Sequence, residues 1–260
     1  MSGYVERLVP SLLASCTWEQ RTQAAREQRV VPDACVDLTW SGGRLTIAGP
    51  DTRARLVALA PGTRIVGVRL RPGVAGAVLG LPAGELRDAT PDAADVLGRD
   101  HAEALLDALV RAAGAGNDVR PGTAGAGNDL RPGAASARDD PHAILLAAIE
   151  SRGAAGPDPL VRAAVTALGR PHARVAAVAT ELGLSARQLQ RRVTDAVGYG
   201  PKTLARILRF RRLQALPAGP LVELALEAGY ADQAHMTSEV THLAGIAPVR
   251  FLKDRTPTAA

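Results

Sequence analysis

The chain has 260 residues, more than one typical domain needs and enough for two. Hydrophobic residues make up 47% and charged residues 22%, which excludes a chain that is disordered throughout. The chain contains 31 Lys+Arg and 26 Asp+Glu. From Pro157 onward there are 14 basic and 8 acidic residues, which leaves 17 basic and 18 acidic residues before it. The net positive charge of +5 therefore belongs to the C-terminal part, as expected if that part contacts a polyanion, although a solvated basic face gives the same asymmetry.

Two cysteines, Cys16 and Cys35, are too few for a disulfide framework and have no metal-ligand spacing, so we expect no metal and a reducing, cytoplasmic location. Residues 13–16 are similar to a bacterial lipoprotein cleavage site. The segment before them contains Glu6 and Pro10 and lacks a basic start and a long apolar run, so secretion is not expected. No run of about 20 apolar residues occurs, and we expect no membrane partner.

Residues 1–113 are predicted to form a β-rich α+β domain with trailing helices, for which a cupin-like barrel is one suitable architecture. Strand patterns occur first, and residues 65–71 alternate apolar and polar side chains as a half-buried strand does. The period then changes to that of helices. The expected strands cover 30–31, 36–40, 45–47 and 65–71, and the expected helices cover 74–79 and 93–113.

Residues 114–140 are predicted to be a linker. Residues 114–124 are repeated almost unchanged as residues 125–135, and their Gly and Pro content is too high for a packed core. The Asn-Asp pair in each copy suggests a calcium-binding repeat, but two copies with so few carboxylates argue against one.

Residues 157–255 are predicted to be an all-α domain built from a repeated unit. Each copy is expected to contain a helix, a tight turn, a second helix, a glycine stop and a proline restart. The two copies are offset by 46 residues before an insertion and by 47 after it. The matching positions are Ala179, Gly183, Leu189, Val193, Thr194, Gly198 and Pro201 in the first copy, and Ala225, Gly229, Met236, Val240, Thr241, Gly245 and Pro248 in the second.

The spacing within one copy has a physical explanation. Gly183 follows the first helix, where a left-handed backbone favours glycine, and Ser185 can cap the second helix. Leu189 and Val193 are four residues apart, so they share the inner face of that helix. This is helix-turn-helix geometry, in which the second helix enters the major groove of DNA.

The outer face of the second helix carries Arg187, Gln190 and Arg191. An arginine can donate two hydrogen bonds to guanine and a glutamine can pair with adenine, whereas a lysine lacks the planar fork. The alternative is an ordinary helical hairpin with a solvated basic face. Two copies, joined by a basic helix over 201–216 about 24 Å long, favour DNA binding, since such a rod could hold two helices near the 34 Å of one DNA turn. The candidate DNA contacts are Ser185, Arg187, Gln188, Gln190, Arg191, Lys202, Arg206, Arg209, Gln233, His235, Thr237 and Ser238.

Residues 160–252 resemble the DNA-binding domain of AraC-type bacterial transcription regulators, on the strength of the motifs at 193–204 and 229–235. Residues 32–40 and 66–73 are similar to an uncharacterised sensor-type domain fused to it. The resemblance implies base reading by Arg187, Gln190 and Arg191 and, in the second copy, by Gln233, His235 and Thr237. Members usually have arginine in place of Ser238, aromatic residues in place of Met236 and Val240, and basic residues in place of Thr241 and His242, so the first copy should dominate specificity.

The sequence therefore predicts a transcription regulator that binds double-stranded DNA, needs no cofactor and is not an enzyme. A small-molecule effector, RNA polymerase and a second copy of the chain are further candidate partners. The candidate effector residues are Asp33, Cys35, Asp37, Trp40 and Arg69, and strand alternation would place the first three on one face. Arg53, Arg69 and Arg71 could bind an anionic effector. The alternative is an N-terminal enzyme that uses the Cys35 thiol, with His101 or His142, or a metal.

Overall fold

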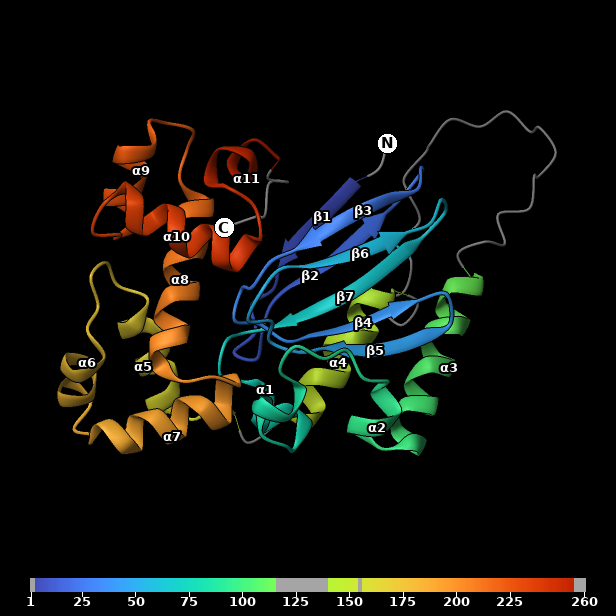
Figure 1. Ribbon diagram of the computed structural model, residues 1–260. Helices are drawn as coiled ribbons and strands as arrows, with labels where there is room; N and C mark the ends of the chain where they lie inside the picture. Colours follow the sequence, from blue (N-terminus) through green and yellow to red (C-terminus); the bar gives the residue numbers. More distant parts are fainter. Residues whose placement is uncertain (1–2, 116–139, 154–155, 255–260) are drawn as a thin grey trace, which may run out of the picture.

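The structure is a computed structural model that describes residues 3–115, 140–153 and 156–254. A β-rich domain and a helical domain lie side by side (Figure 1). The fold class predicted from the sequence, a β-rich α+β domain followed by an all-α domain, is confirmed. Most of the predicted linker, including both Asn-Asp pairs, lies outside the described residues.

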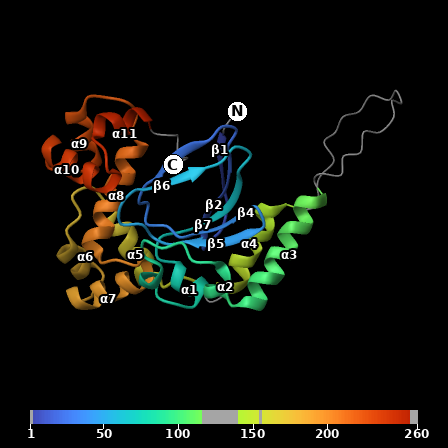
Figure 2. The same cartoon turned by 45° about the vertical axis from the view of Figure 1, so that its right-hand side comes forward.

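The first domain is built around a five-stranded antiparallel sheet in the order β1-β2-β7-β4-β5. A separate two-stranded ribbon, β3 with β6, lies over one face of this sheet, and helices cover the other face (Figure 2). The bounds are β1 Gly3–Leu8, β2 Ala14–Arg21, β3 Arg26–Val30, β4 Asp37–Ser41, β5 Arg44–Ala48, β6 Arg55–Leu59 and β7 Arg64–Leu70.

The alternation predicted for β7 is confirmed by its two faces. Val66, Val68 and Leu70 are buried under the helices, together with Leu38 of β4, and they form the core of this domain. Arg69 points to the opposite face, beneath the β3–β6 ribbon. The sheet therefore has an apolar face toward the helices and a polar face toward the ribbon.

The helices of the first domain differ from the sequence-based prediction in two ways. The single helix expected over 93–113 is wrong, because Gly98 adopts φ +87° and divides it into α2 and α3. After the segment that the structure does not describe, α4 returns to the sheet and buries Leu145 and Ile149 in the core of the first domain. The bounds are α1 Ala75–Leu79, η1 Ala83–Leu86, α2 Ala93–Leu97, α3 Arg99–Ala115 and α4 Pro141–Arg152.

The second domain contains the predicted repeat. Both copies begin with a short helix, continue through a glycine turn into a longer helix, and end at a glycine with positive φ before a proline restarts the chain. The connecting helix α8 packs against both copies, and one apolar core serves the whole domain. The bounds are α5 Pro159–Leu168, α6 Val175–Glu181, α7 Ala186–Val197, α8 Pro201–Ala215, α9 Leu221–Ala228, α10 Gln233–Ala244 and α11 Pro248–Asp254.

No helix among the described residues is both long enough and apolar enough to span a membrane. The same part of the chain contains no group of three or more His, Cys, Asp or Glu side chains placed to hold a metal ion.

Candidate nucleic-acid interface

The two helix-turn-helix turns are closed in the same way. The amide of Leu184 donates to the carbonyl of Ala179 at 2.9 Å, and the amide of Tyr230 donates to that of Ala225 at 2.9 Å. In each turn the residue before the donor is a glycine with positive φ, which lets the chain reverse after the helix. The 46-residue offset seen in the sequence is thus an offset between two equal backbone structures.

Helix α7 begins with a complete capping box. The Ser185 hydroxyl accepts from the amide of Gln188 at 3.2 Å, and the Gln188 side chain accepts from the amide of Ser185 at 2.8 Å. The cap predicted for Ser185 is confirmed. Two backbone donors at the start of the helix are satisfied, so its first turn is held in place without help from another element.

The outer face of α7 is free. Leu189 and Val193 are fully buried, whereas Arg187, Gln190 and Arg191 are exposed, as the spacing predicts. Neither Arg187 nor Arg191 forms an ion pair with any residue that the structure describes. Both line a shallow, open depression of about 530 Å³ together with Ser185 and Gln188. The Gln190 amide donates to the Thr194 hydroxyl at 3.2 Å, which holds it along the helix.

Helix α10, the equivalent of α7, has a different N-terminus. The Asp232 carboxylate caps it by accepting from the amide of His235 at 2.7 Å. The His235 ring is turned inward: Nδ1 accepts from the amide of Ala231 at 3.2 Å and Nε2 lies 3.2 Å from a Glu239 oxygen. His235 thus supports the start of α10 from inside, while Gln233, Thr237 and Ser238 remain exposed.

Glu239 is a buried carboxylate that sequence reasoning did not identify. It accepts from Arg206 Nε at 3.1 Å and from Arg209 Nη1 at 3.0 Å. The Arg209 guanidinium also lies 5.3 Å from the ring centre of Tyr230. A signal was present, since Glu239 stands between the core positions Met236 and Val240, where an acid needs a cationic partner.

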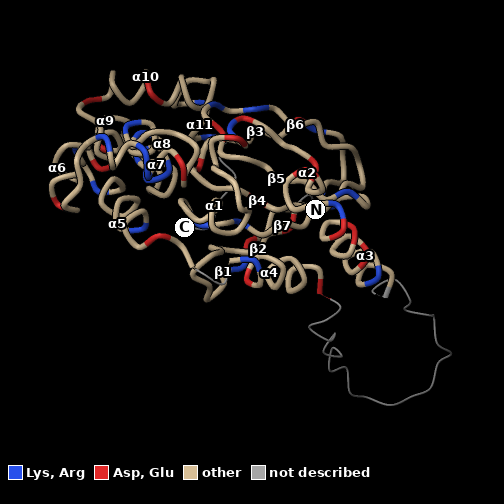
Figure 3. Tube along the Cα trace, turned by 90° about the horizontal axis from the view of Figure 1, so that it is seen from below, with Lys and Arg blue, Asp and Glu red and all other residues tan. Residues whose placement is uncertain are grey.

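Most of the basic residues of α8 have partners inside the molecule. Arg206 and Arg209 pair with Glu239, Arg211 donates to the carbonyl of Asp33 at 3.2 Å, and Arg212 donates to that of Ala228 at 3.0 Å. Lys202 is exposed. Basic positions are dense around α7 and α8 (Figure 3), but those of α7 are the better placed for a ligand.

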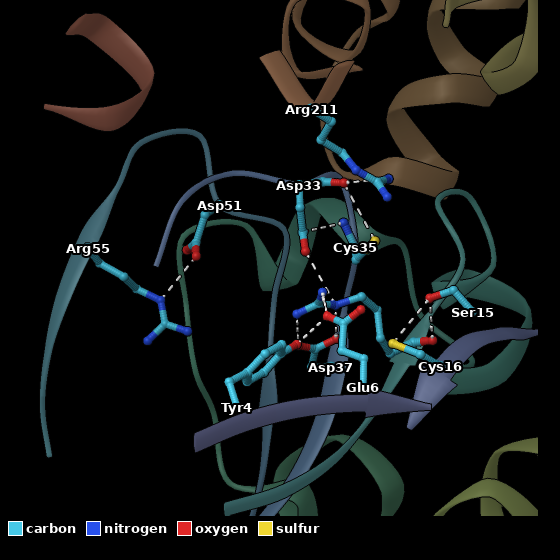
Figure 4. Close-up of polar contacts among 11 residues, drawn as sticks. Tyr4, Glu6, Ser15, Cys16, Asp33, Cys35, Asp37, Asp51, Arg55 and Arg211 are labelled. Carbon is cyan, nitrogen blue, oxygen red and sulfur yellow. Dashed lines mark hydrogen bonds and ion pairs between the residues drawn. The ribbon is translucent and has the colours of Figure 1, made fainter. Parts of the chain in front are cut away.

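In the first domain, Arg69 is the centre of a polar cluster with Glu6, Asp33 and Asp37. The side chains of these three acids lie close together in Figure 4. The Arg69 guanidinium donates to both oxygens of Asp37 at 3.0 Å, and lies 3.3 Å from Asp33 and 3.2 Å from Glu6. The Tyr4 hydroxyl donates to Glu6. The structure therefore brings together the predicted residues Asp33, Asp37 and Arg69, and adds Tyr4 and Glu6.

The expectation that Asp33, Cys35 and Asp37 share one strand face is wrong. Strand β4 begins only at Asp37, and Ala34 adopts φ +66° in a turn in which the Cys35 amide donates to Asp33 Oδ1 at 2.9 Å. Trp40, three residues after Asp37, lies on the opposite face of the strand and packs in the apolar core.

Both thiols lie in surroundings that suppress their ionisation. Burial, reinforced by the Asp33 charge, raises the pKa of Cys35, and burial raises the pKa of Cys16 to about 11. The ring of His142 contacts Glu19 at 3.4 Å on the helix-covered face of the sheet, whereas the sulfur of Cys35 contacts the carbonyl of Asp33 at 3.5 Å. The structure does not form the Cys35–His142 pair that a thiol enzyme would use.

Two family models match parts of the chain. Residues 178–254 match a helix-turn-helix domain, and residues 8–92 match a domain of unknown function (DUF6597). The predicted combination, an AraC-type helix-turn-helix domain behind an uncharacterised N-terminal domain, is confirmed at the level of these domains. No curated protein matches the chain.

Several solved structures are similar in fold. The C-terminal domain of AraT, a response regulator from Geobacillus stearothermophilus, is 21% identical, with 39% of this chain and 90% of that chain covered and a TM-score of 0.36. ToxT from Vibrio cholerae is 10% identical, with 93% and 98% covered and a TM-score of 0.46. ToxT bound to an unsaturated fatty acid is 8% identical, with 100% and 99% covered and a TM-score of 0.42.

Proposed function

We propose that this chain, in which a helix-turn-helix domain follows a domain of unknown function, is a transcription regulator that binds specific double-stranded DNA in the cytoplasm. Helix α7 reads bases in the major groove, chiefly through Arg187, Gln190 and Arg191. Helix α10 adds contacts from Gln233 and Thr237, and Lys202 contacts the phosphate backbone. We further propose that the first domain consists of residues 3–115 together with α4.

The observation that carries this proposal is the free, capped start of α7. A helix that enters the major groove must present its N-terminal half without competing partners, and Arg187 and Arg191 have no ion pair in the described part of the chain. By contrast, Arg192 of the same helix is paired with Asp158 at 2.7 Å. The guanidinium groups that remain available are those on the face turned away from the core.

The Arg69 cluster supports a sensing role for the first domain. Three carboxylates surround one guanidinium in a largely buried site, and burial raises the pKa of Asp37. Because Arg69 is already neutralised, an effector bound here would be cationic or neutral rather than anionic. The effector site then contains Asp33, Asp37 and Arg69, with Cys35 nearby and Trp40 behind the sheet. RNA polymerase and a second copy of the chain remain proposed partners.

The test is to select binding sequences from random DNA with the full chain and then compare variants on the selected site. The double substitution Arg187→Ala with Arg191→Ala should remove most of the discrimination between this site and random DNA, about 1–3 kcal/mol for each lost base contact. The control, Arg99→Ala with Arg111→Ala, removes the same charge from exposed positions on α3. Equal discrimination by the two double variants would refute the proposal.

A further inference from the structure

We propose that the loop of residues 49–54, between β5 and β6, is a brace that fixes α7 and α10 relative to each other. The loop would thereby set the spacing between the two DNA elements that the chain reads. This inference rests on the proposed function, since it assigns a positioning role to residues of the first domain that lie outside both helix-turn-helix units.

One end of the loop contacts the end of α7. Gly198 terminates this helix with φ +93°, and a Cβ atom on it would lie 2.7 Å from Pro50 Cγ and 2.9 Å from the carbonyl oxygen of Ala83. The Arg87 guanidinium donates to the carbonyl of Gly198 at 3.4 Å. The helix end is thus pressed directly against the first domain, and only glycine leaves enough room for the contact.

The other end of the loop contacts the end of α10. The amide of Ala54 donates to the carbonyl of Leu243 at 2.7 Å, and the Arg29 guanidinium donates to that of Ala244 at 2.8 Å. Carbonyl groups in the last turn of a helix lack partners within the helix, and a cation there is favoured by the helix dipole. The first domain therefore caps α10 with one backbone and one side-chain donor.

The loop between these two contacts is built to be stiff. Asp88 accepts from the amide of Thr52 at 2.6 Å and from its hydroxyl at 2.8 Å. The amide of Gly49 donates to the carbonyl of Ala89 at 2.9 Å, and a Cβ on Gly49 would lie 1.7 Å from the carbonyl oxygen of Leu86. The loop is anchored at both its start and its middle to the segment after η1.

A second connection between α7 and α10 restricts relative motion of these helices that α8 alone would permit. Helix α8 joins the two units, but a single rod between them can bend and twist. The loop adds a second connection that touches the C-terminal ends of both helices, while their N-terminal halves point away from the first domain (Figure 1). Changing the spacing of two DNA elements by one base pair displaces one of them by about 3.4 Å and turns it by about 35°, so a braced pair of helices should tolerate only one spacing.

The experiment measures affinity for selected DNA in which the spacing between the two elements is changed by one base pair. The wild-type chain should lose at least about tenfold, because the second element loses its base contacts. A variant with two glycines inserted between Thr52 and Arg53 should lose less than about threefold. Arg29→Met, which keeps the aliphatic stem but removes the donor to Ala244, should show a loss of affinity between these two values. The matched control carries the same insertion between Gly42 and Gly43, an exposed turn with nothing within 4 Å of a Cβ on either glycine, and should behave as wild type.

A second measurement needs no DNA. Spin labels at Asp195→Cys and His242→Cys, equivalent positions on α7 and α10, report the distance between these helices, and both native cysteines are buried. The loop insertion should broaden the distance distribution, and the Gly42–Gly43 insertion should leave it narrow. An unchanged distance distribution in the loop-insertion variant overturns the brace. If that variant does not fold, an unchanged distribution in Arg29→Met overturns it. A wild-type chain without sequence-specific binding overturns the proposed function, while the distance measurement still decides on the brace.

Discussion

At the scale of single residues, Glu239 holds two of the arginines of α8, Arg206 and Arg209, in ion pairs inside the protein. Its carboxylate lies within 3.2 Å of Arg206, Arg209 and His235, and its side chain is 11% exposed. A buried carboxylate keeps its charge only with such partners. The same three side chains are candidates for DNA contacts, so under the proposed function this one acid on α10 would compete with DNA for their hydrogen bonds.

Glu239→Gln should therefore lower the free energy of unfolding by about 2–3 kcal/mol, because two guanidinium groups lose their charged partner in a partly buried site. The salt dependence of DNA binding should become steeper, by up to about one logarithmic unit per freed arginine, if these groups then reach phosphates. Urea unfolding measures the first effect, and titrations at several salt concentrations measure the second.

Glu227→Gln, an exposed acid on α9, is the control and should change neither quantity. An unchanged stability for Glu239→Gln would mean that the carboxylate does not hold the cluster. The expectation from the sequence that Arg209 contacts phosphate would then regain support. If the Glu239 ion pairs persist in the DNA complex, Arg209→Ala should lower the free energy of unfolding and leave the salt dependence of DNA binding unchanged.

At the scale of elements, the two copies of the repeated unit each contain a turn glycine with positive φ, but the atoms around the two glycines differ. Gly183 has φ +65°, and a Cβ on it would have nothing within 4 Å, whereas a Cβ on Gly229, at φ +90°, would lie 3.2 Å from the Cα of Pro171. Both substitutions to alanine carry the cost of a left-handed backbone, about 1–2 kcal/mol. Gly229→Ala should add a steric cost and destabilise the protein more than Gly183→Ala, which thermal unfolding of the pair can test. Equal losses would show that Pro171 moves aside freely.

The sequence was sufficient for features that depend on local spacing. Both turns, the Ser185 cap and the glycine stops follow from residues fewer than ten positions apart, so periodicity and backbone preference decide them. The sequence could not show that Glu239 pairs with Arg209, thirty residues earlier, or that Glu6 and Asp37 both pair with Arg69. Those contacts depend on tertiary packing, which no local pattern encodes.

Strand alternation failed for a related reason. The interpretation of Asp33, Cys35 and Asp37 as one face assumed an extended chain, and Ala34 breaks that assumption with a left-handed backbone. Non-glycine residues rarely adopt this conformation, so no sequence rule predicts it here. Asp33 and Asp37 still converge on Arg69, because Asp37 is the direct cross-strand partner of Arg69 and the turn brings Asp33 beside them.

At the scale of the whole molecule, α4 packs on the first domain, and the chain passes to the second domain beyond its C-terminal end. Glu19 of β2 supports this docking, because its carboxylate accepts from Arg64 of β7 and lies 3.4 Å from the ring of His142 of α4. The brace and the Asp33–Arg211 contact then connect the first domain to α7, α8 and α10. A change in the first domain can thus reach α7 and α10 through packed, hydrogen-bonded contacts.

The Glu19 site also predicts how stability depends on pH. Burial alone would raise the pKa of Glu19, but the hydrogen bonds and charges of Arg64 and Arg21 outweigh it and lower the pKa from 4.5 to about 2. Because the unfolded chain binds the proton at higher pH, the stabilisation is complete above about pH 5 and is lost as the pH falls toward 2.

Glu19→Gln should therefore lower the free energy of unfolding by about 1–3 kcal/mol at pH 7 and flatten its decline between pH 5 and 2. Urea unfolding across this range measures both effects, with Glu103→Gln on the exposed face of α3 as the control. An acid profile for Glu19→Gln as steep as that of the control would exclude the contacts of Glu19 with Arg64 and Arg21 as a source of stability that is lost in acid.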